Sequence, residues 1–279
     1  MTEFNNAAVL ITGAGGGFGR QLTRQFVAKG SKVILHDIDP ELLQAVQDET
    51  PGGSENVLAA ITADLSDAVG CQKLFGEVTG AGFRPDILVN NAGIGVGGRL
   101  DLVPRDRWEQ VMQVDLLSPM RLTELFLPQM IERESGHIVN ISSIAGWIGA
   151  KRLTSYCAAK FGLRGFSEAL SRDVEEYGIK VSTIYPWFSR TPILQSESFG
   201  PEERSEVPDD VVTDPADVVA AMLRGIEKNK LHIFPDRYAG RIQFMKRHMP
   251  RLLDRIMQRM ERKMREESEY PEELKKAAE

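Results

Sequence analysis

Short apolar runs alternate with longer segments of helical periodicity along most of the chain. Continuous apolar runs that end at glycine, proline or a polar residue predict buried strands. Segments with apolar residues every three or four positions predict helices. The expected strands cover residues 7–12, 31–36, 56–62, 85–90, 137–141, 179–185 and 231–234, and the expected helices cover 20–29, 41–48, 66–78, 107–133, 155–177 and 215–228.

This strict alternation predicts an α/β fold, a doubly wound parallel sheet in three α/β/α layers. We expect one domain over residues 1–235 and a helical extension over 236–279. Ser66 is expected to cap its helix, and Pro119 and Pro128 to bend the long helix or mark its last turn. Residues 196–212 are polar and aperiodic, which predicts a mobile loop or lid.

The overall composition is that of a soluble globular protein. The 279 residues are 42% hydrophobic and 27% charged, with a net charge of −6, which argues against nucleic acid as the main partner. Cys71 and Cys157 form no disulfide framework, no basic and apolar leader is visible, and no apolar run reaches the roughly 18 residues of a membrane span. We therefore expect a cytoplasmic protein. The scattered histidines have no metal-ligand spacing, and we expect no catalytic metal.

The extension after residue 235 has a charge of opposite sign. Between Arg237 and Arg265, ten lysines and arginines stand against two acidic residues, so the rest of the chain carries −14. An apolar stripe at helical spacing runs through this basic segment: Leu252, Leu253, Ile256, Met257, Met260 and Met264. Two interpretations remain open. The stripe packs on the body or on a partner subunit as a wall of the substrate site, or it makes peripheral contact with an anionic membrane.

Glycines crowd the loop after the first expected strand, where Gly13, Gly17 and Gly19 precede a helix. Glycine lets the backbone approach a pyrophosphate, and the helix N-terminus offers free N–H groups. Residues 93–98 repeat the glycine spacing without the following helix or a downstream acid. There we expect a loop of close backbone approach rather than a second phosphate site.

An acidic residue ends each of the next two expected strands. Asp37 follows the second strand, where a carboxylate accepts a hydrogen bond from a ribose 2′-OH and repels a 2′-phosphate. We find no basic neighbour, so the pattern favours NAD over NADP. Asp64 ends the third strand and is placed to reach adenine, whereas Asp39 is expected to start a helix.

Three polar side chains are expected to converge between residues 143 and 160. Ser143 follows the strand 137–141, and Tyr156 and Lys160 lie four residues apart, on one face of the next helix. A phenol, an ammonium group and an alcohol could thus meet at one substrate oxygen. Ser142 alternates to the other face and is expected to be structural.

Together these motifs resemble the short-chain dehydrogenase/reductase family, in its shorter single-domain branch. The matching pieces occur in the family's order across roughly residues 5–235: the glycine loop from Thr12 to Gly19, Asn90-Asn91-Ala92-Gly93, Ser143, Tyr156 with Lys160, and Pro186 with Thr191. The resemblance implies a Rossmann fold, a nicotinamide cofactor and alcohol/carbonyl oxidoreduction. It also implies a homodimer or homotetramer built on the two long helices.

The resemblance assigns a role to each catalytic position. Tyr156 is the general acid/base, and Lys160 with the nicotinamide charge would lower its pKa from about 10. Lys160 also holds the nicotinamide ribose, Ser143 hydrogen-bonds the substrate oxygen, and Thr191 grips the carboxamide. The other residues expected to contact the cofactor are Gly13, Gly17, Phe18, Gly19, Asp37, Asp64, Leu65, Asn91, Ala92, Gly93 and Pro186.

Two positions depart from the family pattern. Asp115 stands where the family has an asparagine that supports a water relay to the lysine. It either keeps the relay or is structural. Trp187 replaces a glycine after Pro186 and would narrow the site or form an apolar wall.

We predict an NAD(H)-dependent dehydrogenase/reductase for a secondary alcohol/ketone pair, hydrophobic because Trp147, Trp187 and Phe188 lie near the site. The alternative is a nucleotide-binding regulatory or scaffold protein of the same fold that docks through its tail.

Overall fold

A seven-stranded parallel sheet forms the centre of the molecule. The computed structural model describes residues 1–200 and 211–267, with side chains to residue 259. The strand order is β3-β2-β1-β4-β6-β7-β9. The strands are β1 (Ala8–Thr12), β2 (Lys32–Asp37), β3 (Val57–Thr62), β4 (Ile87–Asn90), β6 (His137–Ile141), β7 (Lys180–Ile184) and β9 (His232–Ile233). The predicted doubly wound α/β fold is confirmed, and its order reverses between β1 and β4, where such sheets bind ligands.

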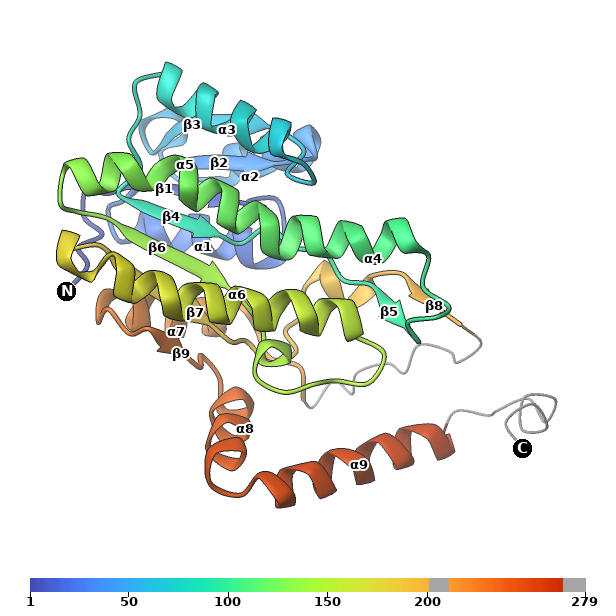
Figure 1. Ribbon diagram of the computed structural model, residues 1–279. Helices are drawn as coiled ribbons and strands as arrows, with labels where there is room; N and C mark the ends of the chain where they lie inside the picture. The colour runs from blue at the N-terminus through green and yellow to red at the C-terminus, as the bar shows by residue number, and fades with distance from the viewer. Residues whose placement is uncertain (201–210, 268–279) are drawn as a thin grey trace.

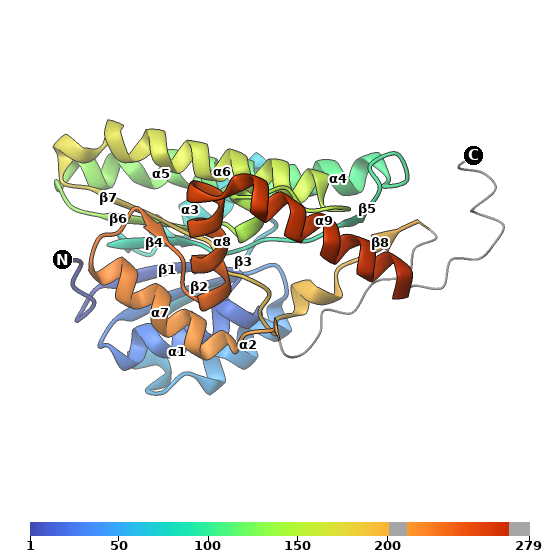
Figure 2. The same ribbon diagram turned by 90° about the horizontal axis from the view of Figure 1, so that it is seen from below.

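Helices cover both faces of the sheet (Figure 1 and Figure 2). One face carries α1 (Gly17–Ala28), α2 (Pro40–Glu49) and α7 (Pro215–Glu227), and the other α3 (Ala68–Gly80), α4 (Arg105–Met112), α5 (Ser118–Glu132) and α6 (Thr154–Asp173). Alternate residues of each strand enter the two cores. Val9 and Ile11 pack with Phe26 of α1, whereas Leu10 packs on the opposite face with Phe126 of α5. Burial on both faces explains the continuous apolar runs.

The long helix expected over residues 107–133 contains a π-helical turn, Gln113–Leu117, between α4 and α5. Pro119 has no N–H to donate to the carbonyl of Asp115 four residues earlier, so the regular α ladder is interrupted there. Pro128 lies inside α5 without ending it. The irregularity therefore falls one turn before Pro119 and includes Asp115.

Two local expectations need correction. Asp67, not Ser66, caps α3, because its Oδ1 accepts the N–H of Gly70 at 2.8 Å while the N–H of Ser66 is held by Asp64. The expected mobile loop contains a short strand, β8 (Ser198–Phe199), which pairs in parallel with β5 (Gly97–Gly98). Residues 201–210 of that loop lie outside the described residues.

The second glycine loop is one of close approach, as expected. A Cβ on Gly95 would lie 2.6 Å from Ser196 Oγ, and Gly98 has a φ of +141°. A side chain at Gly95 would push this loop away from Ser196, and one at Gly98 would strain the backbone.

The extension forms two helices, α8 (Arg237–His248) and α9 (Pro250–Glu267). β9 ends at Ile233 and α8 begins at Arg237, so the predicted boundary between residues 235 and 236 falls between these two elements. α9 leaves the end of α8 and runs toward the part of the molecule that holds β5 and β8 (Figure 1 and Figure 2). Within the described residues, no helix combines the length and the apolar character needed to cross a membrane.

Candidate active site

A cavity of about 1130 Å³ opens at the carboxyl ends of the central strands. It is lined by every residue expected at the site except Gly19 and Asp115, which are buried behind its wall. The parallel arrangement brings these loops to one edge of the sheet because each of them follows a strand of the same direction.

The glycine loop is packed closely against two neighbouring segments and against itself. A Cβ on Gly15 would lie 2.9 Å from Asp37 Oδ2, one on Gly17 would lie 2.6 Å from Thr191 Cγ2, and one on Gly19 would overlap the carbonyl oxygen of Gly13. Within this loop, only Gly16 has room for a side chain: a Cβ there would lie 3.4 Å from its nearest neighbouring atom. No side chain caps α1 at Gly16, so first-turn N–H groups are available to a phosphate. The loop therefore fits the pyrophosphate of a dinucleotide.

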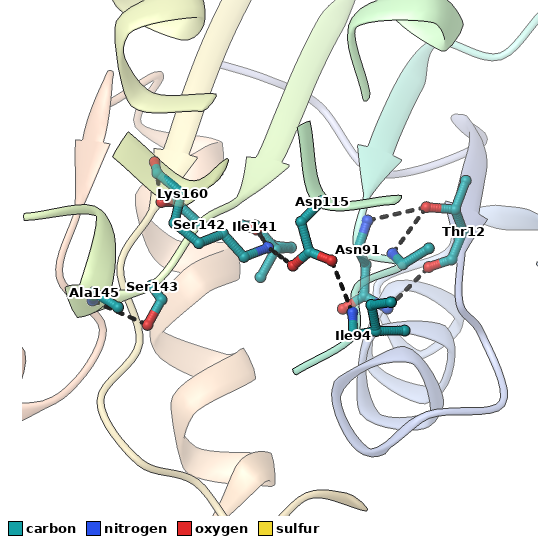
Figure 3. Close-up of polar contacts among 10 residues, drawn as sticks. Thr12, Asn91, Ile94, Asp115, Ile141, Ser142, Ser143, Ala145 and Lys160 are labelled. Atoms are coloured by element: carbon teal, nitrogen blue, oxygen red, sulfur yellow. Dashed lines mark hydrogen bonds and ion pairs between the residues drawn. The ribbon is translucent and has the colours of Figure 1, made fainter. Parts of the chain in front are cut away.

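Asn91 and Thr12 fasten this loop to β4 (Figure 3). The Asn91 side-chain amide donates to the carbonyl oxygens of Thr12 at 2.9 Å and Gly13 at 3.0 Å. Thr12 Oγ1 accepts the N–H groups of Asn91 and Ala92, both at 3.0 Å. Asn91 lines the cavity, but its amide donors are committed to positioning the glycine loop.

Asp37, at the end of β2, lines the cavity beside the glycine loop and is hydrogen-bonded to it. Its Oδ2 accepts the N–H of Gly15 at 2.8 Å, and its Oδ1 accepts the N–H of Asp39 at 3.1 Å. A carboxylate has about four acceptor positions, so capacity for a ribose hydroxyl remains. Asp39 caps α2 through the N–H groups of Glu41 and Leu42, which confirms that it starts a helix.

Sequence reasoning missed three residues beside Asp37. Ile38 and Leu42 are exposed apolar side chains on the cavity wall and form a surface suited to an adenine ring. Arg20 also lines the cavity, although no basic neighbour was expected. Its guanidinium donates to the Gly15 carbonyl at 3.1 Å and pairs with Glu49 at 2.8 Å. Arg20 directly follows Gly19, the last glycine of the loop, and this closeness in sequence could have predicted a cation beside the cofactor site.

Ser143 and Ser142 face opposite ways at the end of β6. Ser143 Oγ lines the cavity and accepts the N–H of Ala145 at 3.1 Å, and its hydroxyl also interacts with Tyr156. Ser142 Oγ donates to the Lys160 carbonyl at 3.1 Å, inside the fold. This hydrogen bond agrees with the structural role expected for Ser142, which also borders the cavity.

Tyr156 and Lys160 lie on the first turns of α6, and Lys160 Nζ is 5.5 Å from the centroid of the Tyr156 ring. Lys160 Nζ also donates to the Ile141 carbonyl at 3.0 Å and lies 3.0 Å from Asp115 Oδ2. Asp115 Oδ1 accepts the N–H of Ile94 at 2.8 Å (Figure 3). An ammonium group has three protons, so one is left for the cavity.

The buried Asp115–Lys160 pair sets the electrostatics of the site. Burial alone would lower the pKa of Lys160, but the charges of Asp115 and Tyr156 outweigh it and the pKa is raised. Burial raises the pKa of Asp115 against the influence of Lys160 and of the Ile94 N–H. Lys160 is therefore held as a cation, with a carboxylate as its direct neighbour.

Burial also raises the pKa of Tyr156, and this differs from the sequence expectation of a lowered value. Lys160 and a hydrogen bond with Ser143 favour the phenolate, but Asp115 opposes it and burial is the largest effect. The residues of the chain thus keep Tyr156 in its phenol form. The positive nicotinamide ring invoked in the expectation would add to the effect of Lys160.

An apolar wall closes the side of the cavity beyond Ser143. Trp187 lies on this wall with Ile148 and Met257, and its ring meets that of Phe188 edge to face at 4.8 Å. The Trp187 backbone N–H donates to Asp236 Oδ2 at 2.9 Å, which ties this wall to the start of α8. Trp187 thus brings the extension into the site.

Comparisons with known proteins agree with this geometry. The chain matches the model of the short chain dehydrogenase family over residues 7–200. It is 30% identical to dehydrogenase/reductase SDR family member 7B of Bos taurus, covering 93% of this chain and 83% of that protein. It is 31% identical to epidermal retinol dehydrogenase 2 of Mus musculus, covering 87% and 78%. A short-chain dehydrogenase from Streptomyces avermitilis has a TM-score of 0.79 and 28% identity, covering 94% of this chain and 99% of that one.

The family match covers the segments that carry the glycines, Asn91, Ser143 and the Tyr156–Lys160 pair, and the fold places these segments around one cavity. The chain belongs to the short-chain dehydrogenase family and is an NAD(P)-dependent oxidoreductase.

Proposed function

We propose that the protein transfers a hydride between NAD(H) and a hydrophobic secondary alcohol/ketone pair. One observation carries the proposal: Ser143, Tyr156 and Lys160 line the same cavity as the glycine loop and Asp37. A binding-only protein has no need for an acid/base, a cation and a hydroxyl donor at one point of its nucleotide site.

The bound cofactor supplies the redox chemistry. Tyr156 moves the proton: its phenolate accepts the hydroxyl proton of the alcohol during oxidation, and its phenol returns a proton to the carbonyl oxygen during reduction. Ser143 lines the cavity with a hydroxyl group that can donate to that oxygen and so hold it in place.

Lys160 acts on this proton transfer by charge. Its ammonium group, close to the Tyr156 ring, favours the phenolate, and its remaining proton is available to a ribose hydroxyl of the cofactor. Asp115, behind the cavity wall, keeps Lys160 charged and holds it at a fixed position.

NAD is the proposed cofactor because Asp37 lies at the ribose end of the glycine loop. Its carboxylate would accept from a 2′-OH and repel a 2′-phosphate. Arg20, the cation nearby, is already paired with Glu49.

The proposed substrate is hydrophobic because apolar side chains, Trp187, Ile148 and Met257, line the cavity beyond Ser143. A relative whose name specifies retinol supports an apolar substrate.

The test is reduction of a panel of hydrophobic ketones with NADH by the purified protein, with Tyr156→Phe beside it. We expect Tyr156→Phe to lower kcat by at least about 100-fold and to bind NADH as the original chain does. Tyr177→Phe, on the surface away from the cavity, is the matched control and keeps full activity. Unaltered turnover in Tyr156→Phe contradicts the mechanism, and NADH binding without reduction of any ketone favours the regulatory alternative.

A further inference from the structure

The two helices of the extension, α8 and α9, which we call the arm, present a basic and apolar edge to solvent. We propose that this edge docks on the surface of an anionic phospholipid bilayer and places the mouth of the cavity beside the lipid.

Packing on the body accounts for only one side of the apolar stripe on α9. Leu253 is 3% exposed and joins Met257 in the cluster around Ile148. Leu252 and Ile256 are 45% and 39% exposed. Each precedes an inward residue by one position and so lies about 100° around the helix from it. The stripe is wider than its contact with the body, and its outer half stays exposed to solvent.

A row of arginines follows this outer half. Arg251, Arg255 and Arg259 recur every fourth residue and are all exposed. Each lies one position before or three positions after Leu252 or Ile256, so the row runs along the solvent side of the apolar edge. No ion pair engages these three arginines among the side chains that the structure describes. Around α9 the order is therefore guanidinium groups, exposed apolar side chains, and buried apolar side chains.

The same combination occurs on α8, where Phe244 is 54% exposed and Lys246 and Arg247 are exposed nearby. Over residues 237–259 the arm has seven lysines and arginines and one acidic residue, in a chain whose net charge is −6. The positive charge is thus concentrated on the two helices that also expose apolar side chains.

An anionic bilayer fits both properties of this edge. Lipid phosphates would pair with the arginine row, and Leu252 and Ile256 would enter the boundary between headgroups and acyl chains. A nucleic acid would use the arginines but leave the apolar side chains in water. A second copy meeting this edge symmetrically would bring the two arginine rows together, which like-charge repulsion disfavours.

Met257 connects the docked edge to the site. It lies on α9 between the exposed edge and the body, and it lines the cavity together with Trp187. A bilayer bound along Leu252 and Ile256 would lie next to this apolar wall, so a lipophilic substrate could enter from the lipid. This last consequence rests on the proposed function, whereas the docking itself does not.

Vesicle sedimentation of the full chain, without substrate or cofactor, tests the docking. We expect binding to phosphatidylcholine vesicles that contain about 30% phosphatidylglycerol, release at high salt, and no binding to phosphatidylcholine alone. The variants Leu252→Ser/Ile256→Ser and Arg251→Ser/Arg255→Ser should each lower the partition coefficient about tenfold or more. Val69→Ser, at a 75% exposed apolar position on α3, is the control and should bind like the original chain.

Three outcomes would overturn the docking. The full chain stays in the supernatant, it binds equally to vesicles with and without phosphatidylglycerol, or both double variants bind as the original chain does. Light scattering on the same variants identifies a competing occupant. If Leu252→Ser/Ile256→Ser changes the molar mass in solution and leaves vesicle binding unaffected, a second copy covers this edge instead. Ketone reduction is assayed separately, in detergent-free buffer without vesicles. A chain that binds vesicles but reduces no ketone contradicts only the proposed function, and a chain that reduces ketones but binds no vesicles contradicts only the docking.

Discussion

Asp115 Oδ2 lies 3.0 Å from Lys160 Nζ, and both side chains are buried. The carboxylate at the position of the family's asparagine is therefore in direct contact with the lysine. It also accepts the N–H of Ile94, in the loop that follows β4. One side chain thus connects the lysine beside Tyr156 to the loop at the cofactor side of the cavity.

Asp115→Asn should shift the acidic limb of the pH profile for alcohol oxidation to lower pH. The Asp115 charge contributes to the raised pKa of Tyr156, so its removal favours the phenolate. The measurement is kcat/KM against pH, with NADH binding as a check on the fold. An unmoved limb would show that the carboxylate acts on structure alone.

Asp115→Ala should lower the free energy of unfolding by about 3–5 kcal/mol, because it leaves Lys160 buried without its counter-charge. Urea unfolding gives the value, and Asp101→Ala, which removes an exposed ion pair with Arg99, is the control with little effect. Equal stability of the two variants would contradict a buried ion pair.

Ser143→Ala and Ser142→Ala should separate catalysis from packing. Ser143→Ala should reduce kcat about 100-fold or more, because it removes a donor to the reacting oxygen, and should lose about 1 kcal/mol of stability with the hydrogen bond from the Ala145 N–H. Ser142→Ala should keep kcat and lose about 1 kcal/mol of stability with the hydrogen bond to the Lys160 carbonyl. Steady-state kinetics and thermal melts on the two proteins check this; the reverse pattern would move the donor role to Ser142.

Asp37→Asn should shift the cofactor preference toward NADP. The amide still offers an acceptor to the Gly15 N–H but no longer repels a 2′-phosphate. We expect the ratio of kcat/KM for NAD to that for NADP to fall about 10- to 100-fold, or about 1.4–2.8 kcal/mol. If the original chain prefers NADP, the interpretation of Asp37 is wrong and Arg20 is the residue to examine.

Gly19→Ala and Gly16→Ala should fail for different reasons. A methyl group at Gly19 overlaps the Gly13 carbonyl, so the variant should be destabilised by about 2 kcal/mol or more without any cofactor. At Gly16 the nearest atom is 3.4 Å away, so the fold should survive while NADH affinity falls. Unfolding curves and NADH titration distinguish them, and equal destabilisation of both would contradict the open position of Gly16.

His137 should make the protein sensitive to acid. Burial lowers its pKa from 6.5 to about 3, with a smaller effect of Lys180. The folded state stays neutral while the unfolded state binds a proton below pH 6.5, so stability is lost as the pH falls from about 6.5 toward 3. The contribution is about 2 kcal/mol between pH 7 and pH 5. His137→Asn should show a correspondingly smaller loss in urea unfolding at the two pH values, and an identical loss would contradict the assignment.

Hydrophobic periodicity predicted the sheet well because the central strands are buried on both faces and the apolar runs end near a glycine, proline or polar residue. β6 has the predicted bounds, and the other strands of the main sheet begin or end within about two residues of them. The π-helical turn was missed because a proline in the sequence shows only that one backbone N–H is lacking. The packing around the helix decides whether it bends, ends or forms a π-helical turn there. The cap at Asp67 was missed because Ser66 and Asp67 are both good capping residues.

Spacing along the chain was enough to predict the fold class, the family and most of the residues proposed for the site. Only the tertiary structure decided what those residues touch. It placed Asp115 against Lys160, Thr191 against Gly17 and Arg20 beside the cavity. These residues lie on segments whose distance in space depends on how the helices and loops pack. It also divided the apolar stripe of α9 into a buried and an exposed half, because periodicity gives the width of an apolar face but not how much of it a neighbour covers.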